Sequence, residues 1–338
     1  MKHLPDPQLS FEPLTRMLYG AIPSRLLLAA IELDVFSHLT QPLSAEALAP
    51  RMHASPERAR PFLDALVAND LLEKRAGRYG NTPIAEAFLV KGRPTYLGDV
   101  FLNISGYMQP AFEALTALVQ ARPAPPGEPR QPGGPDPETQ IYANYQRAGR
   151  AQQAAAMISE LPEFPRMRRM LDLGAGAGLI GLAIVAAHPT MTGVLFDRPD
   201  VVQVAQQYIH EYDLADRVTT IGGDYAVDPI GDGYDLIWSS YTLNFQRGNL
   251  DPIMHKIRAA LTPGGVYVSM SEGLTQDRTK PATLVNSMLA HSLAGSELTF
   301  DDGEIAQAML RAGFRSVHSR HAASPCWHGP VVVDIARP

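Results

Sequence analysis

Cysteine, clustered positive charge and long apolar runs are all scarce in this chain of 338 residues. The single cysteine, Cys326, excludes an internal disulfide framework and a cysteine-rich metal site. The net charge is −6 and Lys and Arg form no long run, which argues against a nucleic-acid or anionic-membrane partner because both attract clustered cations. The longest apolar stretch, 179–187, is too short to cross a bilayer.

The N-terminus also lacks the features of a secretory leader. The first residues, MKHLPDPQLSFEP, place prolines and acids where a signal peptide needs an apolar core. What the chain does contain is ordinary for a globular protein, with 45 % hydrophobic and 19 % charged residues. We therefore predict a cytoplasmic protein with no membrane or nucleic-acid partner.

A proline-rich segment divides the chain. In residues 121–138, seven residues are proline and three are glycine, a density that neither a helix nor a sheet interior tolerates. We interpret it as a linker or surface loop. The predicted organisation is a first domain over 1–120, the linker over 121–138 and a second domain over 139–338, in keeping with a chain of this length.

The first part has the pattern of a winged helix. Apolar residues recur at helical spacing over 25–39, a second helix begins after Ser44, and a third begins at Ser55–Pro56. Two short strand-like pieces flank Gly77, and a final helix begins near Thr82. The sequence thus predicts a mainly helical domain that contains a small hairpin.

Winged helices often bind DNA, but the charge of this one is nearly balanced. Between Ser44 and Tyr79 there are six basic and five acidic residues. A recognition helix needs a positive face to hold phosphates. We therefore favour packing against a second subunit over DNA binding.

After the linker, strands alternate with helices, which is typical of a parallel α/β sheet. The expected strands lie near residues 167–173, 192–197, 217–224, 234–243 and 264–273, with helices at 179–189 and 201–214 between the first three. The last stretch, 314–337, indicates two antiparallel strands that close the sheet. The fold class is therefore α/β, with a Rossmann-like sheet behind the helical domain.

A glycine-rich turn follows the first expected strand of this sheet. The segment Asp172-Leu-Gly174-Ala-Gly176-Ala-Gly178 lets a nucleotide-like ligand approach the backbone at a helix N-terminus. Asp197 follows about twenty residues later, as a dinucleotide fingerprint requires. By itself this pattern fits a nicotinamide cofactor, S-adenosylmethionine, or a tight strand–helix turn that binds nothing.

Three further features favour S-adenosylmethionine. Asp172 precedes the first glycine by two residues, within reach of a ligand amino group; Asp224 ends the third strand; and Pro263-Gly264-Gly265 precedes the fifth. In this order and spacing the sequence resembles class I methyltransferases, and among them the plant-type and bacterial small-molecule O-methyltransferases. That family has a winged-helix-like N-terminal dimerisation domain, so the resemblance covers nearly the whole chain. It implies S-adenosylmethionine as cofactor, a small-molecule methyl acceptor and a homodimer.

The resemblance also assigns cofactor contacts to matching positions. It places Gly174 and Gly176 under the methionine part of the cofactor and Asp197 on the ribose hydroxyls. Arg198 stands where the family has leucine, so the wall of the adenosine pocket differs. The resemblance further implies that Asp172 binds the amino group and that Asp224 and Tyr225 flank the adenine. Ser239 and its neighbour Ser240 are expected near the sulfonium.

One departure concerns the catalytic base. The family has a histidine that deprotonates the acceptor hydroxyl, and Asn244 stands in its place. An amide is no base at neutral pH, although it can orient a hydroxyl by hydrogen bonding. We therefore keep three acceptors open: a hydroxyl, which we place first; the sulfur of a thioether or thiol, such as a carboxylate-bearing methylthio acid; and a ring carbon of a pigment-like molecule. A non-catalytic cofactor-binding regulator is a further alternative.

Candidate catalytic and acceptor-binding residues follow from the same resemblance. With Asn244, we select His291 and Tyr142 as catalytic candidates. The helical segment 141–148 resembles the family helix that enters the site, and His291 lies on a helix that lines the acceptor pocket in the family. The expected substrate contacts are Tyr145, Arg147, Tyr107, Asn103 and Met288. No cluster of His and carboxylates has metal-ligand spacing, so we predict no metal.

Overall fold

The computed structural model describes residues 8–120, 137–323 and 330–338. Contacts divide the chain into two compact units, Met1–Ile104 and Ser105–Pro338. This division lies N-terminal to the predicted boundary at residue 120, and most of the predicted linker lies outside the described residues. Each unit is described by itself.

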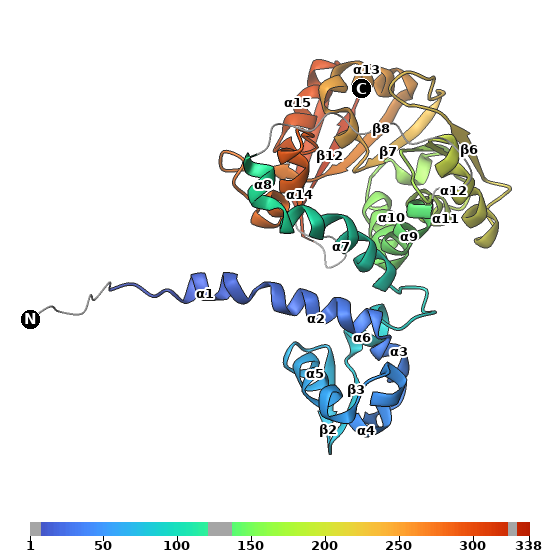
Figure 1. The fold of residues 1–338 in the computed structure, drawn as a ribbon. Helices are drawn as coiled ribbons and strands as arrows, with labels where there is room; N and C mark the ends of the chain where they lie inside the picture. Colours follow the sequence, from blue (N-terminus) through green and yellow to red (C-terminus); the bar gives the residue numbers. More distant parts are fainter. Residues whose placement is uncertain (1–7, 121–136, 324–329) are drawn as a thin grey trace, which may run out of the picture. The chain divides into compact units, whose positions relative to one another are not determined.

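The first unit contains short helices around a three-stranded sheet of order β1-β3-β2 (Figure 1). Its elements are α1 (Glu12–Tyr19), α2 (Ala21–Glu32), α3 (Val35–His38), β1 (Leu43–Ser44), α4 (Ala45–Leu48), η1 (Ala49–Met52), α5 (Pro56–Ala68), β2 (Leu72–Arg75), β3 (Arg78–Asn81) and α6 (Pro83–Phe88).

Local chemistry explains most of these boundaries. The Ser44 side chain accepts a hydrogen bond from the Ala47 backbone N–H and caps α4, and α5 begins at Pro56 as expected. Ala76 and Gly77 both have positive φ, which suits the tight turn of the β2–β3 hairpin. The helix expected over 25–39 is instead two helices, because Asp34 adopts a left-handed conformation at φ 52° and ends the first.

The second unit is built on a seven-stranded sheet of order β11-β12-β8-β7-β4-β5-β6. Its strands are β4 (Arg169–Leu173), β5 (Thr192–Asp197), β6 (Val218–Gly222), β7 (Tyr234–Ser240), β8 (Leu261–Ser271), β11 (Ser316–Ala322) and β12 (Val331–Arg337). The five strands from β4 to β8 pair in parallel, whereas β12 pairs antiparallel with both β8 and β11. The Rossmann-like sheet and its antiparallel closing hairpin are therefore confirmed.

Helices cover both faces of this sheet (Figure 1). One core includes apolar residues of α10 (Ala151–Ser159), α11 (Leu179–Ala186) and α12 (Pro199–Glu211). The other includes residues of α13 (Leu250–Ala260) and α15 (Glu304–Arg311). Because successive side chains of a strand point to opposite faces, Met170 and Leu171 of β4 belong to different cores.

Further elements belong wholly or partly to this unit. They are α7 (Gly98–Glu113), which crosses the division, α8 (Leu115–Gln120), α9 (Pro137–Tyr145), η2 (Gln146–Arg150), η3 (Phe164–Arg166), η4 (Leu243–Asn249), β9 (Gly273–Leu274), α14 (Ala282–Leu293) and β10 (Phe300–Asp301). Across the described ranges, no helix combines the length and apolar character that crossing a bilayer requires.

The strand order reverses at β4. This strand lies between β5, which follows it in sequence, and β7, which comes after a crossover. Open α/β sheets bind ligands in the crevice at the carboxyl ends of such a pair of strands. The fold therefore directs attention to the loops that follow β4, β5 and β7.

Candidate active site

The loop after β4 depends on its glycines. Gly174, Gly176 and Gly178 all have positive φ, a conformation that other residues rarely adopt. A Cβ on Gly174 would lie less than 3.0 Å from the Thr242 side chain, and one on Gly178 would lie 2.6 Å from a methyl of Leu195. Gly176 is different, because its nearest neighbour would be the Gln146 Nε2 atom at 3.4 Å. Neighbouring side chains therefore leave no room for a Cβ at Gly174 and Gly178, whereas a Cβ at Gly176 would make an ordinary contact.

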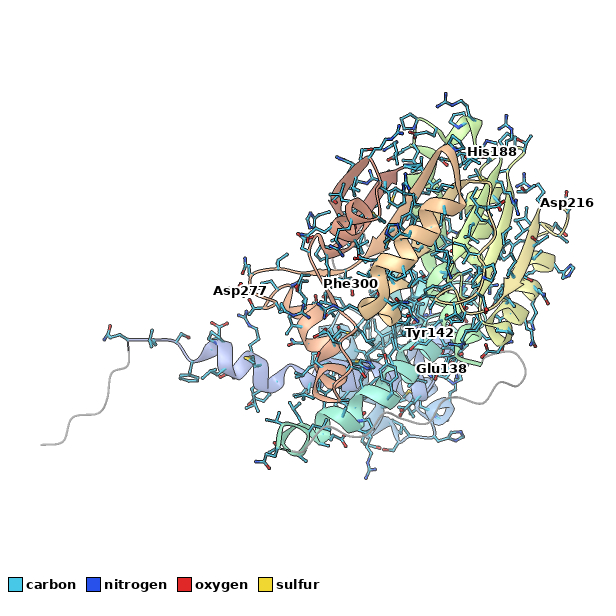
Figure 2. The ribbon with its side chains drawn as sticks, turned by 90° about the horizontal axis from the view of Figure 1, so that it is seen from above. Glu138, Tyr142, His188, Asp216, Asp277 and Phe300 are labelled. Atoms are coloured by element: carbon cyan, nitrogen blue, oxygen red, sulfur yellow. The ribbon has the colours of Figure 1, made fainter. Side chains whose placement is uncertain are left out.

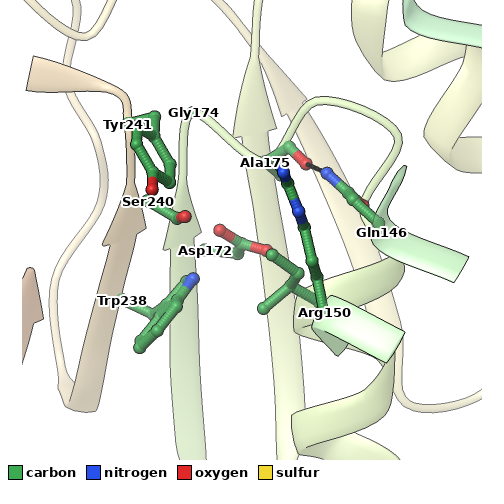
Figure 3. A pocket seen from close by; sticks show the side chains of 9 residues that line it. Gln146, Arg150, Asp172, Gly174, Ala175, Trp238, Ser240 and Tyr241 are labelled. Carbon is green, nitrogen blue, oxygen red and sulfur yellow. Dashed lines mark hydrogen bonds between the residues drawn. The ribbon is translucent and has the colours of Figure 1, made fainter. Parts of the chain in front are cut away.

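A pocket of about 190 Å³ lies beside this loop (Figure 3). Figure 3 shows the Asp172 side chain with Trp238 on one side and Arg150 on the other. The lining residues come from η2 and its junction with α10, from β4 and its glycine loop, from α11, and from the end of β7: Gln146, Arg150, Asp172, Gly174, Ala175, Ile180, Trp238, Ser240 and Tyr241.

Two polar atoms of the pocket walls lack partners. The Asp172 Oδ2 atom and the Trp238 Nε1 atom are buried, and neither makes a hydrogen bond with any described residue. Burial raises the pKa of Asp172 to about 8, with the Gly181 backbone opposing the shift and the Asp197 charge adding to it. Buried polar groups are nearly always hydrogen-bonded. A ligand that brings a cationic donor to Asp172 would satisfy this orphaned oxygen.

Asp197 ends β5 and is held by backbone donors. Its Oδ2 accepts from the Gly176 N–H at 2.8 Å and its Oδ1 from the Arg198 N–H at 2.8 Å. Burial raises the pKa of this carboxyl, and the two backbone hydrogen bonds act in the opposite direction. Each carboxylate oxygen keeps a second lone pair for a ligand hydroxyl. The side chain is therefore oriented before anything binds.

The residues after β6 are positioned by their own turn. Asp224 is exposed, and its Oδ1 accepts from the Ala226 N–H at 2.9 Å. The Tyr225 phenol donates to the Thr242 carbonyl at 2.7 Å, and burial raises the pKa of this phenol. The contact ties the loop after β6 to the end of β7, the strand that forms one side of the pocket.

Of the two serines at the end of β7, only Ser240 lines the pocket. The Ser239 hydroxyl is 1 % exposed and shares a hydrogen bond of 2.8 Å with the Tyr267 phenol of β8. Alternation along the strand explains the difference, since neighbouring side chains point to opposite faces. Of the two serines that the sequence analysis named for the sulfonium side, Ser240 lies in the pocket wall, and a contact of either with the cofactor stays a prediction.

The helix that enters the site places its two arginines differently. The Arg147 guanidinium pairs with Glu211 at 2.9 Å and lies 5.0 Å from the Tyr208 ring centroid, and this arginine does not line the pocket. Arg150 lines it instead, with its guanidinium 4.3 Å from the centroid of the Tyr145 ring. Between the two arginines, Ala148 and Gly149 depart from helical backbone angles, with Gly149 at φ 117°, and beyond this kink Arg150 lines the pocket.

Gln146 fixes this segment against the glycine loop. Its Nε2 donates to the Ala175 carbonyl at 3.4 Å, and its Oε1 accepts from the Leu179 N–H at 2.9 Å. One side chain therefore bonds to the glycine loop and to the first residue of α11. The sequence analysis missed Gln146 and Arg150, because the kink at Ala148 and Gly149 interrupts the helical spacing from which shared faces are predicted.

The tyrosines of α9 stack on one another. Tyr142 and Tyr145 have ring centroids 6.1 Å apart, and Figure 2 marks Tyr142 on α9 one turn from Glu138. Burial raises the pKa of both phenols, and a hydrogen bond with Tyr107 of α7 raises that of Tyr142 further. Tyr107 itself is 52 % exposed. The structure thus brings these three predicted residues together, whereas Asn103 belongs to the first unit.

The two polar atoms of the Asn244 side chain differ in their hydrogen bonding. Its Nδ2 donates to the Leu298 carbonyl at 2.6 Å, and its Oδ1 is buried without a hydrogen-bond partner among the described residues. His291 and Met288 lie on α14 and are partly exposed, and neither lines the pocket. Among the residues that the structure describes, no group of three or more His, Cys, Asp or Glu side chains is arranged to hold a metal.

Comparisons with known proteins agree with this geometry. Residues 136–315 match the family model of the O-methyltransferase domain, and residues 15–91 match that of the O-methyltransferase dimerisation domain. The chain is 30 % identical to the tetracenomycin polyketide synthesis 8-O-methyl transferase of Streptomyces glaucescens, over 92 % of this chain and 93 % of that protein. It is 29 % identical to an N,N-dimethyltransferase of Streptomyces rimosus, over 86 % and 87 %.

A solved structure supports the same fold. Human N-acetylserotonin methyltransferase in complex with S-adenosylmethionine superposes with a TM-score of 0.75 at 23 % identity, covering 100 % of this chain and 99 % of that one. The superposition covers the full length of this chain and therefore includes both units. The glycine loop and its carboxylates therefore lie within a fold that is known to bind this cofactor in another protein.

Proposed function

The chain belongs to the O-methyltransferase family, and from this premise we propose that it methylates a hydroxyl of a small aromatic acceptor within a homodimer. Its cofactor is S-adenosylmethionine. The observation that carries the proposal is the buried, unpartnered Asp172 oxygen in a pocket that Arg150 also lines. The Asp172 carboxylate on one wall and the Arg150 guanidinium on the other match the ammonium and the carboxylate of an amino acid.

The pocket fits the methionine end of the cofactor. In this assignment Asp172 holds the ammonium and Arg150 the carboxylate, beside Gly174 and Ala175 of the glycine loop. The volume of about 190 Å³ is smaller than the ~300–1,000 Å³ of typical ligand pockets, so it accommodates one end of the molecule only. The ribose and adenine then extend past Asp197 toward Asp224 and Tyr225, as the family resemblance predicts.

The cofactor supplies an electrophilic methyl group on a sulfonium. The work of the protein is to hold the acceptor in line with that methyl and to exclude water. Aromatic side chains around the pocket suit this task, because the faces of Trp238 and Tyr241 attract a cation. Asn244 offers its open Oδ1 as a hydrogen-bond acceptor and so orients a group that still carries its hydrogen.

A hydroxylated aromatic is the acceptor class that we favour. The most informative relative in this respect is named for 8-O-methylation in polyketide synthesis. Methylation of an amine is a second candidate, because another relative is named an N,N-dimethyltransferase and because the Asn244 oxygen accepts equally from N–H and O–H. Transfer to sulfur or carbon and a purely regulatory role find no support among these relatives.

The test measures binding first and turnover second. Isothermal titration with S-adenosylhomocysteine should give tight binding to the wild type and at least tenfold weaker binding to Asp172→Asn. Turnover is then measured with hydroxylated naphthalenes and anthraquinones and with matched aromatic amines. Methylation of the hydroxyl compounds is expected; methylation of amines alone would replace the proposal by its second candidate, and binding without any turnover would contradict enzymatic function.

The homodimer proposal rests on α1 of the first unit. This helix buries none of its residues, although its sequence is amphipathic. Phe11, Leu14 and Leu18 lie at helical spacing, and each is at least 69 % exposed. Isolated apolar stripes of this kind mark interaction surfaces. The match to the dimerisation domain begins within this helix, so we propose a second copy of the chain as the partner.

Sedimentation of the full chain tests this surface. The double substitution Leu14→Glu with Leu18→Glu should convert a dimer into a monomer, whereas Arg16→Ala on the same helix should leave the dimer unchanged because Arg16 pairs with Glu12 of its own helix. A monomeric wild type would contradict the proposal. The domain boundaries and the cytoplasmic location remain predictions from the sequence.

A further inference from the structure

We propose that Tyr241 and Glu272 together accept the proton that the acceptor hydroxyl loses, with Glu272 as the final base and the Tyr241 phenol as the relay. The inference rests on the proposed function. It fills the role that Asn244 is chemically unable to perform. The argument begins with the backbone of Tyr241.

Tyr241 adopts a conformation that is costly for a residue with a side chain. Its φ is 56°, in the left-handed region. Such strain costs about 1–3 kcal/mol and persists where surrounding structure enforces it, often at functional sites. Here the Tyr241 N–H donates to the Met270 carbonyl of β8 at 3.0 Å. The strained turn directs the phenol ring into the pocket, near Ser240 and across from Arg150 (Figure 3).

Strand pairing brings Glu272 to the same edge. β7 and β8 pair in parallel, with Ser240 opposite Met270, so the residues that follow both strands emerge together. Glu272 comes directly after the last residue of β8, and its carboxylate is hydrogen-bonded to the Tyr241 phenol. The sequence positions are far apart, and only the sheet register joins them.

The electrostatic surroundings assign different tasks to the two groups. Burial raises the pKa of the Glu272 carboxyl above its ordinary value, and the Arg150 charge and the Tyr241 hydrogen bond oppose that shift. Burial and the Glu272 charge raise the pKa of the Tyr241 phenol, so this phenol stays protonated at neutral pH and is no base by itself. A carboxylate whose pKa lies nearer to neutrality is a stronger base.

The charged and titratable neighbours come from three elements. Arg150 approaches from η2 and α10, Tyr241 from the end of β7, and Asp172 lines the same pocket from β4. Of these, Arg150 stabilises the ionised carboxylate of Glu272. Asp172 is assigned to the cofactor ammonium, which leaves Glu272 as the carboxylate available to the acceptor.

The proton transfer is balanced as follows. The acceptor oxygen forms a bond to the methyl carbon as the bond from that carbon to sulfur breaks, and the sulfonium becomes a neutral thioether. The acceptor hydroxyl proton moves to the Tyr241 oxygen while the Tyr241 proton moves to a Glu272 oxygen. Glu272 then releases this proton to solvent. No oxidant, reductant or further reactant is required.

The experiment compares an oxygen acceptor with a sulfur acceptor. Wild type, Glu272→Gln, Tyr241→Phe and His291→Ala are assayed with the hydroxylated naphthalene or anthraquinone that the wild type methylates fastest, and with its thiol analogue. Thiols ionise far more readily than phenols, so they need little help from a base. The dependence of kcat on pH is measured for both acceptors, and affinity for S-adenosylhomocysteine is measured by titration.

The proposal makes a selective forecast. Glu272→Gln and Tyr241→Phe should lower kcat for the hydroxyl acceptor by about 100-fold or more, the ordinary contribution of general base catalysis, and should remove the acidic limb of its pH profile. Turnover of the thiol and affinity for S-adenosylhomocysteine should change by about threefold or less. His291→Ala is included because the sequence offers His291 as a rival base.

Three results would overturn it. If Glu272→Gln weakens S-adenosylhomocysteine binding as strongly as it lowers kcat, then Glu272 anchors the cofactor and is not the base. If thiol turnover falls as much as hydroxyl turnover, the residue acts structurally. If the acidic limb disappears in His291→Ala and persists in Glu272→Gln, the histidine is the base. Absence of any hydroxyl turnover by the wild type would instead refute the proposed function itself, and this inference with it.

Discussion

The two sides of the pocket are built in different ways. The cofactor side consists of the glycine loop after β4 and of Asp197, whose carboxylate is held by two backbone N–H groups. The proposed acceptor side uses side chains from separate elements: Tyr241, which lines the pocket, Glu272, which is hydrogen-bonded to Tyr241, and Asn244, whose Nδ2 donates to the Leu298 carbonyl. Backbone geometry is set by the fold, whereas side-chain identity varies freely within one fold. Changes on the first side should therefore affect every acceptor alike, and changes on the second should discriminate between acceptors.

The largest expected effect lies on the cofactor side, at Asp197. Asp197→Ala removes a carboxylate that orients the glycine loop and is assigned to the ribose hydroxyls. Two hydrogen bonds to a charged group contribute about 3 kcal/mol or more, so affinity for S-adenosylhomocysteine should fall about 100-fold or more. Titration calorimetry measures this. Asp200→Ala, which removes an ion pair with Arg198 and backbone hydrogen bonds at the start of α12, is the matched control and should change affinity by less than about threefold.

Two glycines of the same loop separate packing from cofactor approach. Gly174→Ala places a Cβ against Thr242 and should reduce the free energy of unfolding by about 3 kcal/mol, from strain and overpacking combined. Gly176→Ala would place its Cβ 3.4 Å from the Gln146 Nε2 atom, an ordinary contact, and should cost about 1 kcal/mol, chiefly from its positive φ. Urea denaturation of the free protein gives both values. Equal losses at both positions would contradict the distinction between a packed and an open glycine.

The two arginines of the entering helix sharpen the comparison further. Arg150→Ala should weaken S-adenosylhomocysteine binding about tenfold, because one charge-assisted contact to the carboxylate is lost. Arg147→Ala should leave that affinity within about twofold, since Arg147 pairs with Glu211 outside the pocket. Titration of both variants under identical conditions is the measurement. A larger loss for Arg147→Ala would contradict the assignment of the cofactor carboxylate to Arg150.

The most gradual effect is a pH dependence that originates at Asp172. Its pKa of about 8 in the free protein means that it is protonated at pH 7, and binding an ammonium group favours the ionised form. Binding should therefore release a proton, and affinity for S-adenosylhomocysteine should rise between pH 6 and pH 8 by at most about tenfold per pH unit. Calorimetry in buffers of different ionisation enthalpy detects the released proton. Asp172→Asn should show neither the release nor the slope.

The same shift predicts how the stability of the free protein depends on pH. Because the pKa of Asp172 is raised above its ordinary value of 3.8, the native state binds more protons than the unfolded state between pH 3.8 and about 8. The contribution of Asp172 to stability is therefore present at low pH and is lost as the pH rises through that window. Asp172→Asn should remove this part of the decline in denaturation experiments at different pH values.

Local patterns in the sequence carried the prediction a long way. The alternation of strands and helices predicted the parallel sheet and its closing hairpin, and both are present. The glycine loop was recognisable because backbone conformation there depends on the residues themselves, as at Gly174. The residues that follow strand ends, such as Asp172 and Asp197, could be placed at one edge for the same reason.

The direction in which a side chain points was harder to predict from the sequence. The sequence analysis named Arg147 as an acceptor contact and both Ser239 and Ser240 for the sulfonium side, whereas Arg150 and Ser240 line the pocket. The place of Arg150 depends on the kink at Ala148 and Gly149 and that of Ser240 on the alternation along β7, and neither was visible in the composition of the segment. The pairing of Tyr241 with Glu272 was not anticipated at all, because it depends on the register between two strands.

The sequence by itself determined the fold class, the cofactor loop and the absence of a histidine at position 244. These follow from hydrophobic periodicity and from residues with special backbone preferences, which act over a few neighbours. Only the tertiary structure decided which side chains share the pocket and which polar atoms remain unpartnered there. Those properties arise where distant segments meet, and their geometry depends on the packing of the whole unit.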